Sequence, residues 1–162
     1  MTADRQLTGT VPPRWVIRTA WVVHRAIYRF TGGRIGLRPP EAGTRFGMLR
    51  LTTIGRRSGQ PRIAIVGYYE DGPNLVTLAM NGWANAEPAW WLNLQAHPDT
   101  VVELKDGVRP VHARAAQGEE RERLWARWGQ FSDKYDAWAA RRPVETAVVV
   151  LEPRAEAPAN AY

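Results

Sequence analysis

The chain has 162 residues, of which 44% are hydrophobic, and this is enough for one folded domain with a core and little more. It contains no cysteine, which excludes disulfides, thiolate metal ligands and cysteine nucleophiles. The formal net charge of +6 is unevenly distributed, because residues 1–50 carry nine arginines against Asp4 and Glu41. Since residues 51–162 are nearly balanced in charge, we expect no nucleic acid as a partner.

Residues 1–45 form a basic leader in which an amphipathic helix is predicted over residues 14–31. Apolar residues recur there every three or four positions, and arginines line the opposite side. The apolar face comprises Val16, Ala20, Val23, Ile27 and Phe30, and the basic stripe comprises Arg14, Arg18, Arg25 and Arg29. Charged residues interrupt this segment too often for a signal peptide or a membrane span, so we expect a cytoplasmic protein.

The leader helix has two interpretations. Its apolar face can pack on the body of the protein while its arginines face water, and this explains the pattern with one face alone. Alternatively, the basic stripe can rest on anionic lipid, which would make the protein membrane-associated. The first interpretation is favoured, and the second stays open.

From Phe46 onward the pattern changes to short strand-like segments. Residues rich in β-branched and aromatic side chains are separated by Asp-Gly pairs at 71–72 and 106–107, which are typical of hairpin turns. The expected strands are residues 46–54, 62–70, 74–80, 100–105, 108–116 and 145–152. Six strands joined by short turns predict a mainly β protein with flanking helices, built as a six-stranded antiparallel barrel.

Two helices are expected between these strands. The first begins at Pro88, a favourable first-turn residue, and ends before Pro98. The second covers residues 119–130 and has apolar side chains along one side. Residues 154–162 are rich in alanine and proline and are expected to form a flexible tail, which leaves residues 46–153 as the barrel domain.

Side chains capable of catalysis are scarce. The histidines lie in different predicted elements without a carboxylate at metal-ligand spacing, so no metal site is expected. Ser58 and Ser132 are the only serines, and neither lies in a nucleophile elbow. The chain also lacks a glycine-rich dinucleotide motif and a P-loop. The sequence therefore argues against a hydrolase.

The turn between the first two predicted strands is the strongest candidate for a binding site. Residues 52–62 read TTIGRRSGQPR and combine two glycines, a serine and three arginines. Backbone amides in such a turn can form an anion-binding concavity, and guanidinium groups match phosphate or carboxylate oxygens. A solvated hairpin with incidental arginines explains these residues equally well.

Aromatic residues form two groups along the chain. One group is Trp83, Trp90 and Trp91, and the other is Trp125, Trp128, Tyr135 and Trp138. Most such rings belong to the core. An aromatic wall beside an anion-binding turn would nevertheless suit a flat heteroaromatic ligand that carries phosphate.

From residue 46 to 153 the chain resembles the deazaflavin (F420)-dependent nitroreductase family, a branch of the FMN-binding split β-barrel fold. Four motifs carry the resemblance: LTTIGRRSGQPR at 51–62, EPAWWLNLQAHPDTVVEL at 87–104, GEERERLWARW at 118–128 and VVVLEP at 148–153. It implies an oxidoreductase that transfers a hydride between coenzyme F420, an 8-hydroxy-5-deazaflavin, and an electron-poor small molecule. An enone, a quinone or a nitro compound would fit that description.

The resemblance also implies the site residues. The anionic tail of F420 would be held by Arg56, Arg57, Ser58, Gly59 and Arg62, and the deazaflavin would lie along Leu78, Ala79, Met80 and Asn81 with Trp90 at its side. Tyr135 and Trp138 match positions where the family often places tyrosines over the substrate face, which makes them the implied catalytic residues. The chain departs from the family in the loop after the third strand, where Asn81 and Met80 match the positions of a lysine and a serine in many members, and Trp83 stands in place of the usual glycine.

Two alternatives to this function remain open. A related split barrel could bind FMN or a lipid-like molecule without redox turnover, and the leader helix could make the protein a membrane-surface module. The expected partners are a small-molecule substrate and a second copy of this chain. A homodimer is expected because barrels of this fold often pair through a sheet face.

Overall fold

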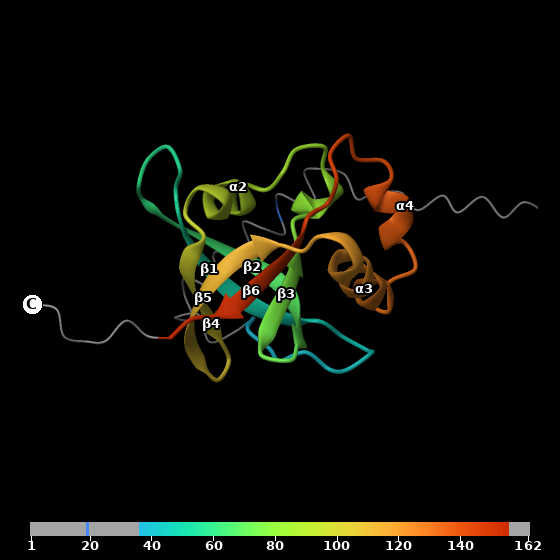
Figure 1. Cartoon of the computed structure of the whole chain (residues 1–162), viewed down its shortest axis with the longest axis horizontal. Coiled ribbons are helices and arrows are strands. Elements are labelled where there is room, and N and C mark those ends of the chain that lie inside the picture. Colours follow the sequence, from blue (N-terminus) through green and yellow to red (C-terminus); the bar gives the residue numbers. More distant parts are fainter. Residues whose placement is uncertain (1–18, 20–35, 156–162) are drawn as a thin grey trace, which may run out of the picture.

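The structure, a computed structural model, describes Thr19 and residues 36–155 (Figure 1). Apart from Thr19, the predicted leader helix lies outside the described residues, as do residues 156–162 of the predicted tail. The described strands are β1 (Gly47–Ile54), β2 (Pro61–Asp71), β3 (Asn74–Leu78), β4 (Asp99–Leu104), β5 (Gly107–Ala115) and β6 (Val148–Pro153). They form a closed antiparallel barrel in the order β1-β2-β3-β6-β5-β4, which confirms the predicted fold.

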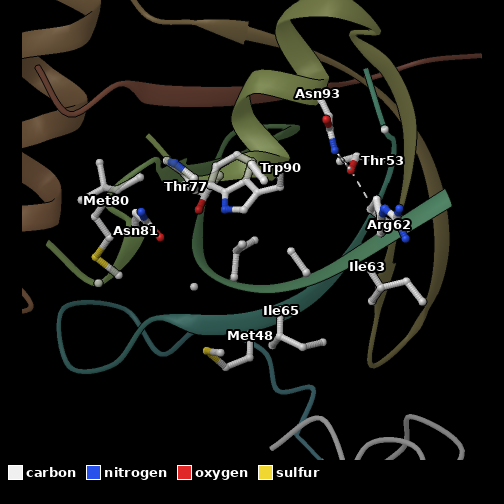
Figure 2. Close-up of a pocket in the computed structure, with 18 of the residues that line it drawn as sticks. Met48, Thr53, Arg62, Ile63, Ile65, Thr77, Met80, Asn81, Trp90 and Asn93 are labelled. Carbon is white, nitrogen blue, oxygen red and sulfur yellow. Dashed lines mark hydrogen bonds between the residues drawn. The ribbon is translucent and has the colours of Figure 1, made fainter. Parts of the chain in front are cut away.

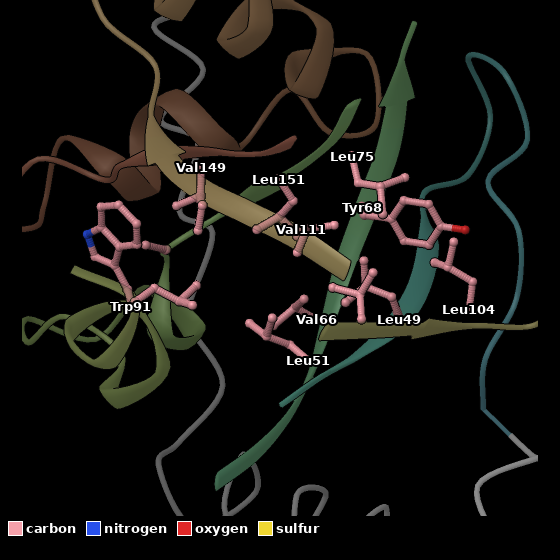
Figure 3. Close-up of a cluster of buried hydrophobic side chains, with 14 residues drawn as sticks. Leu49, Leu51, Val66, Tyr68, Leu75, Trp91, Leu104, Val111, Val149 and Leu151 are labelled. Carbon is pink, nitrogen blue, oxygen red and sulfur yellow. The ribbon is translucent and has the colours of Figure 1, made fainter. Parts of the chain in front are cut away.

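The barrel interior is filled by alternate residues of the strands, as the period of two requires. Along β1, Leu49 and Leu51 point inward and are fully buried, whereas Arg50 between them is partly exposed. They pack with Val66 and Leu151 from other strands (Figure 3), and Val102 of β4 belongs to the same cluster. Burial of each such side chain contributes about 1.5–3 kcal/mol, so this alternation fixes the register of the barrel.

Helices cover two sides of the barrel (Figure 1). Helix α2 (Ala89–Ala96) adds Trp91 and Leu94 to the barrel core. Helices α3 (Gly118–Gly129) and α4 (Tyr135–Ala139) lie on the other side and bury a second cluster that includes Leu124 and Trp128. Both predicted helices are confirmed, but α4 and a 3₁₀ turn, η1 (Asn81–Trp83), were not predicted. No helix of the described residues is both long and apolar enough to cross a membrane.

Several strand ends are shifted from the prediction, and tertiary contacts account for two of the differences near the C-terminal end of the described residues. The last strand begins at Val148 rather than at residue 145, since the Thr146 carbonyl accepts a hydrogen bond from the Arg121 side chain at 3.1 Å instead of from a neighbouring strand. Arg154, predicted as the start of a flexible tail, donates its amide to the Pro110 carbonyl at 3.0 Å. Its side chain also lies 3.4 Å from the Asp99 carboxylate.

Tyr68 should make the barrel sensitive to alkaline pH. Its side chain is 3% exposed, and burial, assisted by Glu70, raises the pKa of its hydroxyl to about 12. In the unfolded chain a tyrosine ionises near pH 10, at about its ordinary value. The folded state therefore keeps the proton longer, and the stability associated with it is complete below pH 10 and is lost as the pH rises towards about 12.

Chemical unfolding of the wild type and of Tyr68→Phe at pH 9, 10, 11 and 12 measures this effect. The free energy of unfolding should fall less steeply above pH 10 in Tyr68→Phe than in the wild type, because the variant lacks one hydroxyl whose pKa rises on folding. Equal slopes in the two proteins would show that Tyr68 does not contribute.

Candidate functional site

A cavity of about 690 Å³ follows β2 along residues 62–67. Strand β2 pairs with β1 from Pro61 to Tyr68, and it pairs with β3 only from Tyr69 to Asp71. The consecutive residues 62–67 all line the cavity, although alternate side chains point to opposite faces of the strand. The cavity therefore wraps around a strand edge that has no β3 partner along residues 61–67.

The two ends of the cavity differ in chemistry. Figure 2 shows Arg62 at one end and Met80 with Asn81 at the other, while Trp90 and Thr77 lie between them. The arginine end also includes Arg56, Arg57 and Ser58 of the turn between β1 and β2. The Met80 end is aromatic, because Met80 packs in the cluster that contributes Phe46, Trp128 and Tyr135 to the lining.

The 55–60 turn is held by its own backbone. The Gly55 amide donates to the Gln60 carbonyl at 2.9 Å, and the Gly59 amide donates to the Gly55 carbonyl at 2.7 Å. Gly59 adopts a φ of 66°, a conformation that favours glycine. At Gly55 a Cβ atom would lie 2.6 Å from the Ser58 Oγ, so a larger residue would displace the serine. These contacts explain both glycines of the GRRSG motif.

A buried polar chain joins this turn to α2. The Asn93 Oδ1 accepts a hydrogen bond from the Arg56 amide at 3.1 Å, and the Asn93 Nδ2 donates to the Thr53 Oγ1 at 3.1 Å. Thr53 in turn donates to the Arg62 carbonyl at 3.4 Å (Figure 2). Asn93 and Thr53 are 4% and 1% exposed, so their polar atoms depend on these partners.

The three arginines at this end of the cavity are free to bind an anionic ligand. Arg56, Arg57 and Arg62 are exposed, and within residues 36–155 none of them forms an ion pair. By contrast, Arg123 and Arg127 elsewhere are neutralised by Asp71 at 2.8 and 3.0 Å. Unpaired guanidinium groups around one end of a cavity attract an anion and can hold it by charge-assisted hydrogen bonds.

The segment after β3 enters the cavity through an unusual turn. Asn81, Gly82 and Trp83 have φ values of 48°, 59° and 62°, so three consecutive residues are left-handed. Asn81 and Gly82 line the cavity, whereas the described lining does not include Trp83. Trp83 packs instead on Tyr135 and Trp138, with ring centroids 5.3 and 5.7 Å away. Left-handed conformations of non-glycine residues cost about 1–3 kcal/mol each, so other contacts must hold this turn.

Tyr135 contributes a hydroxyl to the aromatic end. It lies at the start of α4, is 8% exposed and lines the cavity. Burial raises the pKa of its hydroxyl, so the group keeps its proton at neutral pH and can donate a hydrogen bond. Trp138 packs against Tyr135 with ring centroids 6.0 Å apart and is not part of the described lining.

Most of the predicted site residues meet at this cavity. Those that line it are Arg56, Arg57, Ser58, Arg62, Leu78, Met80, Asn81, Trp90 and Tyr135. The structure places Gly59, Ala79 and Trp138 outside the described lining, because Gly59 shapes the turn, Ala79 is buried in the core and Trp138 supports Tyr135. Sequence reasoning missed Thr53, Asn93, Phe46 and Met48, and the one available signal was a polar asparagine among the apolar residues of α2.

Comparisons with known proteins agree with this geometry. The sequence model of the F420H(2)-dependent quinone reductase family matches residues 21–153. An F420H(2)-dependent quinone reductase of Mycobacterium tuberculosis (strain ATCC 25618 / H37Rv) is 33% identical over 148 residues, which are 87% of this chain and 97% of that protein. A putative F420H(2)-dependent quinone reductase of Mycobacterium bovis has the same identity and coverage.

Solved structures also resemble the described fold. One is an F420-H2 dependent reductase (FDR-A), which is 27% identical with a TM-score of 0.58 and matches over 65% of this chain and 93% of its own. Another, described as a domain-swapped dimer, is 25% identical with a TM-score of 0.60, and matches over 83% and 99% of the two chains.

These findings confirm the predicted F420-dependent family, and they do not favour the alternatives of FMN or of a lipid-like ligand without turnover. The chain therefore belongs to the F420H(2)-dependent quinone reductase family, which makes it a reductase whose cofactor is coenzyme F420.

Proposed function

We propose that this protein reduces a quinone with a hydride taken from reduced F420 bound in the β2-edge cavity. The observation that carries the proposal is the polarity of that cavity, which is cationic at the 55–60 turn and aromatic at the opposite end. The relatives described above are named as quinone reductases, which supports the choice of acceptor. An enone or a nitro compound would make similar demands on the site.

The residues present fit the cofactor. A volume of about 690 Å³ lies within the usual range for small-molecule sites, which is roughly 300–1,000 Å³. Arg56, Arg57, Ser58 and Arg62 would hold the phosphate and the acidic tail. The ring system would lie along the edge of β2, between Trp90 and the Leu78–Asn81 segment.

When bound, F420 supplies the hydride, and the protein supplies position and polarity. Phe46, Met48 and Trp128 form an apolar surface that would seat a flat quinone ring and exclude water from it. Negative charge develops on a quinone oxygen as the hydride arrives. The protonated hydroxyl of Tyr135 would donate a hydrogen bond to that oxygen and stabilise the charge.

A turnover assay tests this function. Purified protein is mixed with reduced F420 and a naphthoquinone, and formation of oxidised F420 is followed by its absorbance. We expect quinone-dependent oxidation that requires the protein and saturates in both substrates. Because reduced FMN reacts with quinones without an enzyme, the comparison is of the protein-dependent rate, and the protein should accelerate the oxidation of reduced F420 but not that of reduced FMN. Absence of quinone-dependent oxidation in a protein that binds F420 would contradict the proposal.

Tyr135→Phe should separate binding from turnover. Loss of the hydroxyl leaves the ring and its packing on Trp83 in place, so the Kd for F420 should change by less than about twofold. Turnover at saturating F420 should fall by about tenfold or more, because a donor to the developing oxyanion has been removed.

The matched control for this variant is Tyr68→Phe, which removes a buried hydroxyl that does not line the cavity. It should leave turnover at neutral pH unchanged. Equal turnover in Tyr135→Phe and in the wild type would show that the Tyr135 hydroxyl takes no part in the reaction. Trp138, which reaches the site only through its packing on Tyr135, would then have no catalytic role either.

A homodimer stays a prediction for this chain. One structural relative is described as a dimer, and Ile63 and Val101 are exposed apolar residues on the outer faces of their strands. Light scattering of the purified protein determines its mass in solution, and a monomeric mass at assay concentrations would contradict this expectation.

A further inference from the structure

Arg142 is a buried cation that lies next to the wall of the cavity rather than in it. It follows α4, and its side chain is directed to the loop of residues 79–86, here called the 79–86 loop. The residue is only 7% exposed. Because Met80, Asn81 and Gly82 of this loop line the cavity, whatever holds the loop also shapes the site.

The Arg142 guanidinium binds the loop at three carbonyl groups. Its Nε donates to the Ala84 carbonyl at 2.8 Å, one terminal nitrogen donates to the Ala79 carbonyl at 3.1 Å, and the other donates to the Ala86 carbonyl at 3.2 Å. A fourth bond, at 2.6 Å, goes to the Thr146 Oγ1. The planar fork of an arginine thus joins both ends of the loop to the segment before β6.

Burial of this cation is unfavourable because the guanidinium loses its hydration, and no ion pair among the described residues offsets that loss. No carboxylate of residues 36–155 lies within ion-pair distance of Arg142, and its partners are neutral oxygens. Burial lowers the pKa of the guanidinium, opposed only by the more distant Glu87. A buried charge without an ion pair adds little net stability, so its main effect here is to fix the positions of the groups to which it donates hydrogen bonds.

The 79–86 loop needs such a contact because it is strained. It contains the three left-handed residues Asn81, Gly82 and Trp83, two of which are not glycine. Its internal bonds are few, namely Trp83 amide to Met80 carbonyl, Ala84 amide to Asn81 carbonyl, and Asn81 Nδ2 to Ala86 carbonyl. Without the guanidinium, the Ala79 and Ala84 carbonyls would lose the partners described above, and the turn could relax to an ordinary conformation.

We propose that Arg142 is a positioning residue that holds the 79–86 loop in its left-handed form and thereby sets the affinity of the site for F420. The inference rests on the proposed placement of the cofactor along Met80 and Asn81. Lysine cannot replace this residue, since a single ammonium group cannot reach three carbonyl groups arranged around a planar fork.

Three variants test the inference. Arg142→Lys keeps the charge and removes the fork, and Thr146→Val keeps the shape of Thr146 but removes one acceptor of the guanidinium. The matched control is Arg114→Lys, which breaks bonds of another arginine fork, to Glu120 and Glu152, away from the cavity lining. For each protein we would measure the Kd for F420 by titration, the rates of amide hydrogen exchange in residues 79–86, and the KM and kcat with reduced F420.

Arg142→Lys should raise the Kd and the KM for F420 by about tenfold, the size expected when a buried hydrogen-bonded charge loses its geometry. The kcat at saturating F420 should stay within about twofold, because bound cofactor restores the loop. Amides of the 79–86 loop should exchange faster, and those of the 55–60 turn should not. Thr146→Val should raise the Kd by about threefold, and Arg114→Lys should lower thermal stability without changing the Kd.

Two results would overturn the inference. If Arg142→Lys binds F420 as the wild type does and its loop exchanges at the wild-type rate, Arg142 does not position the loop. If Arg142→Lys does not fold, an unchanged Kd in folded Thr146→Val leads to the same conclusion. A wild type that binds no F420 would instead refute the proposed function, and this inference with it, so the two failures are distinguishable.

Discussion

Replacing Arg56 or Arg62 with alanine is expected to weaken F420 binding by about ten- to hundredfold for each residue, since each charge-assisted hydrogen bond contributes about 1.5–3 kcal/mol. Both side chains are exposed at the cationic end of the cavity and carry no ion pair among residues 36–155. Their structural contacts use the backbone instead, through the Arg56 amide and the Arg62 carbonyl. Alanine retains those bonds, so the melting temperature without ligand should hardly change.

The matched control is Arg109→Ala, which removes an arginine paired with Asp106 at the β4–β5 hairpin, away from the cavity lining. Fluorescence titration with F420 and a thermal melt are run on all three variants and on the wild type. Arg109→Ala should bind as the wild type does. Unchanged affinity in both Arg56→Ala and Arg62→Ala would eliminate the 55–60 turn as the anion site.

Asn93→Ala is expected to lower both stability and affinity. Removal of the buried amide leaves the Arg56 amide and the Thr53 hydroxyl without the partners they have at 3.1 Å. Thr53 keeps its bond to the Arg62 carbonyl, so the main loss is the acceptor of the Arg56 amide. A buried polar group left without a partner costs about 1–3 kcal/mol, so the melting temperature should fall by several degrees, at roughly 2–8 °C per kcal/mol. The 55–60 turn should then lose its alignment with α2, and the Kd for F420 should rise by about tenfold.

Gln95→Ala serves as the control for this variant, because Gln95 lies on the same helix but is exposed. It should change neither the melting temperature nor the Kd. If Asn93→Ala melts lower but binds F420 with wild-type affinity, the polar chain supports the fold and not the site.

Local patterns were enough to predict the barrel and the turn. The alternation of buried and exposed residues along β1 and the Asp-Gly pairs at the hairpins are properties of short segments, and every predicted strand is present with shifts at its ends. The GRRSG motif likewise carries its geometry in adjacent residues, as the contacts of Gly55 and Gly59 show. These features depend on sequence neighbours, which a single sequence displays.

The remaining parts of the site depend on contacts between distant segments. Asn93 is separated from Thr53 by 40 residues, and Arg142 from Ala79 by 63, so neither pairing leaves a periodic signal. The left-handed turn at Trp83 was also hidden, because a tryptophan normally argues against that conformation.

The central claim is that the 55–60 turn holds the anionic tail of F420, and a comparison of two ligands tests it most directly. Wild-type protein and an Arg56→Ala/Arg62→Ala double variant are titrated with F420 and with the deazaflavin chromophore that lacks the phosphate and the acidic tail. The wild type should bind complete F420 at least about a hundredfold more tightly than the tailless ring, and the double variant should bind the two almost equally. Equal affinity of the wild type for both ligands, in a protein that binds the ring, would contradict the account.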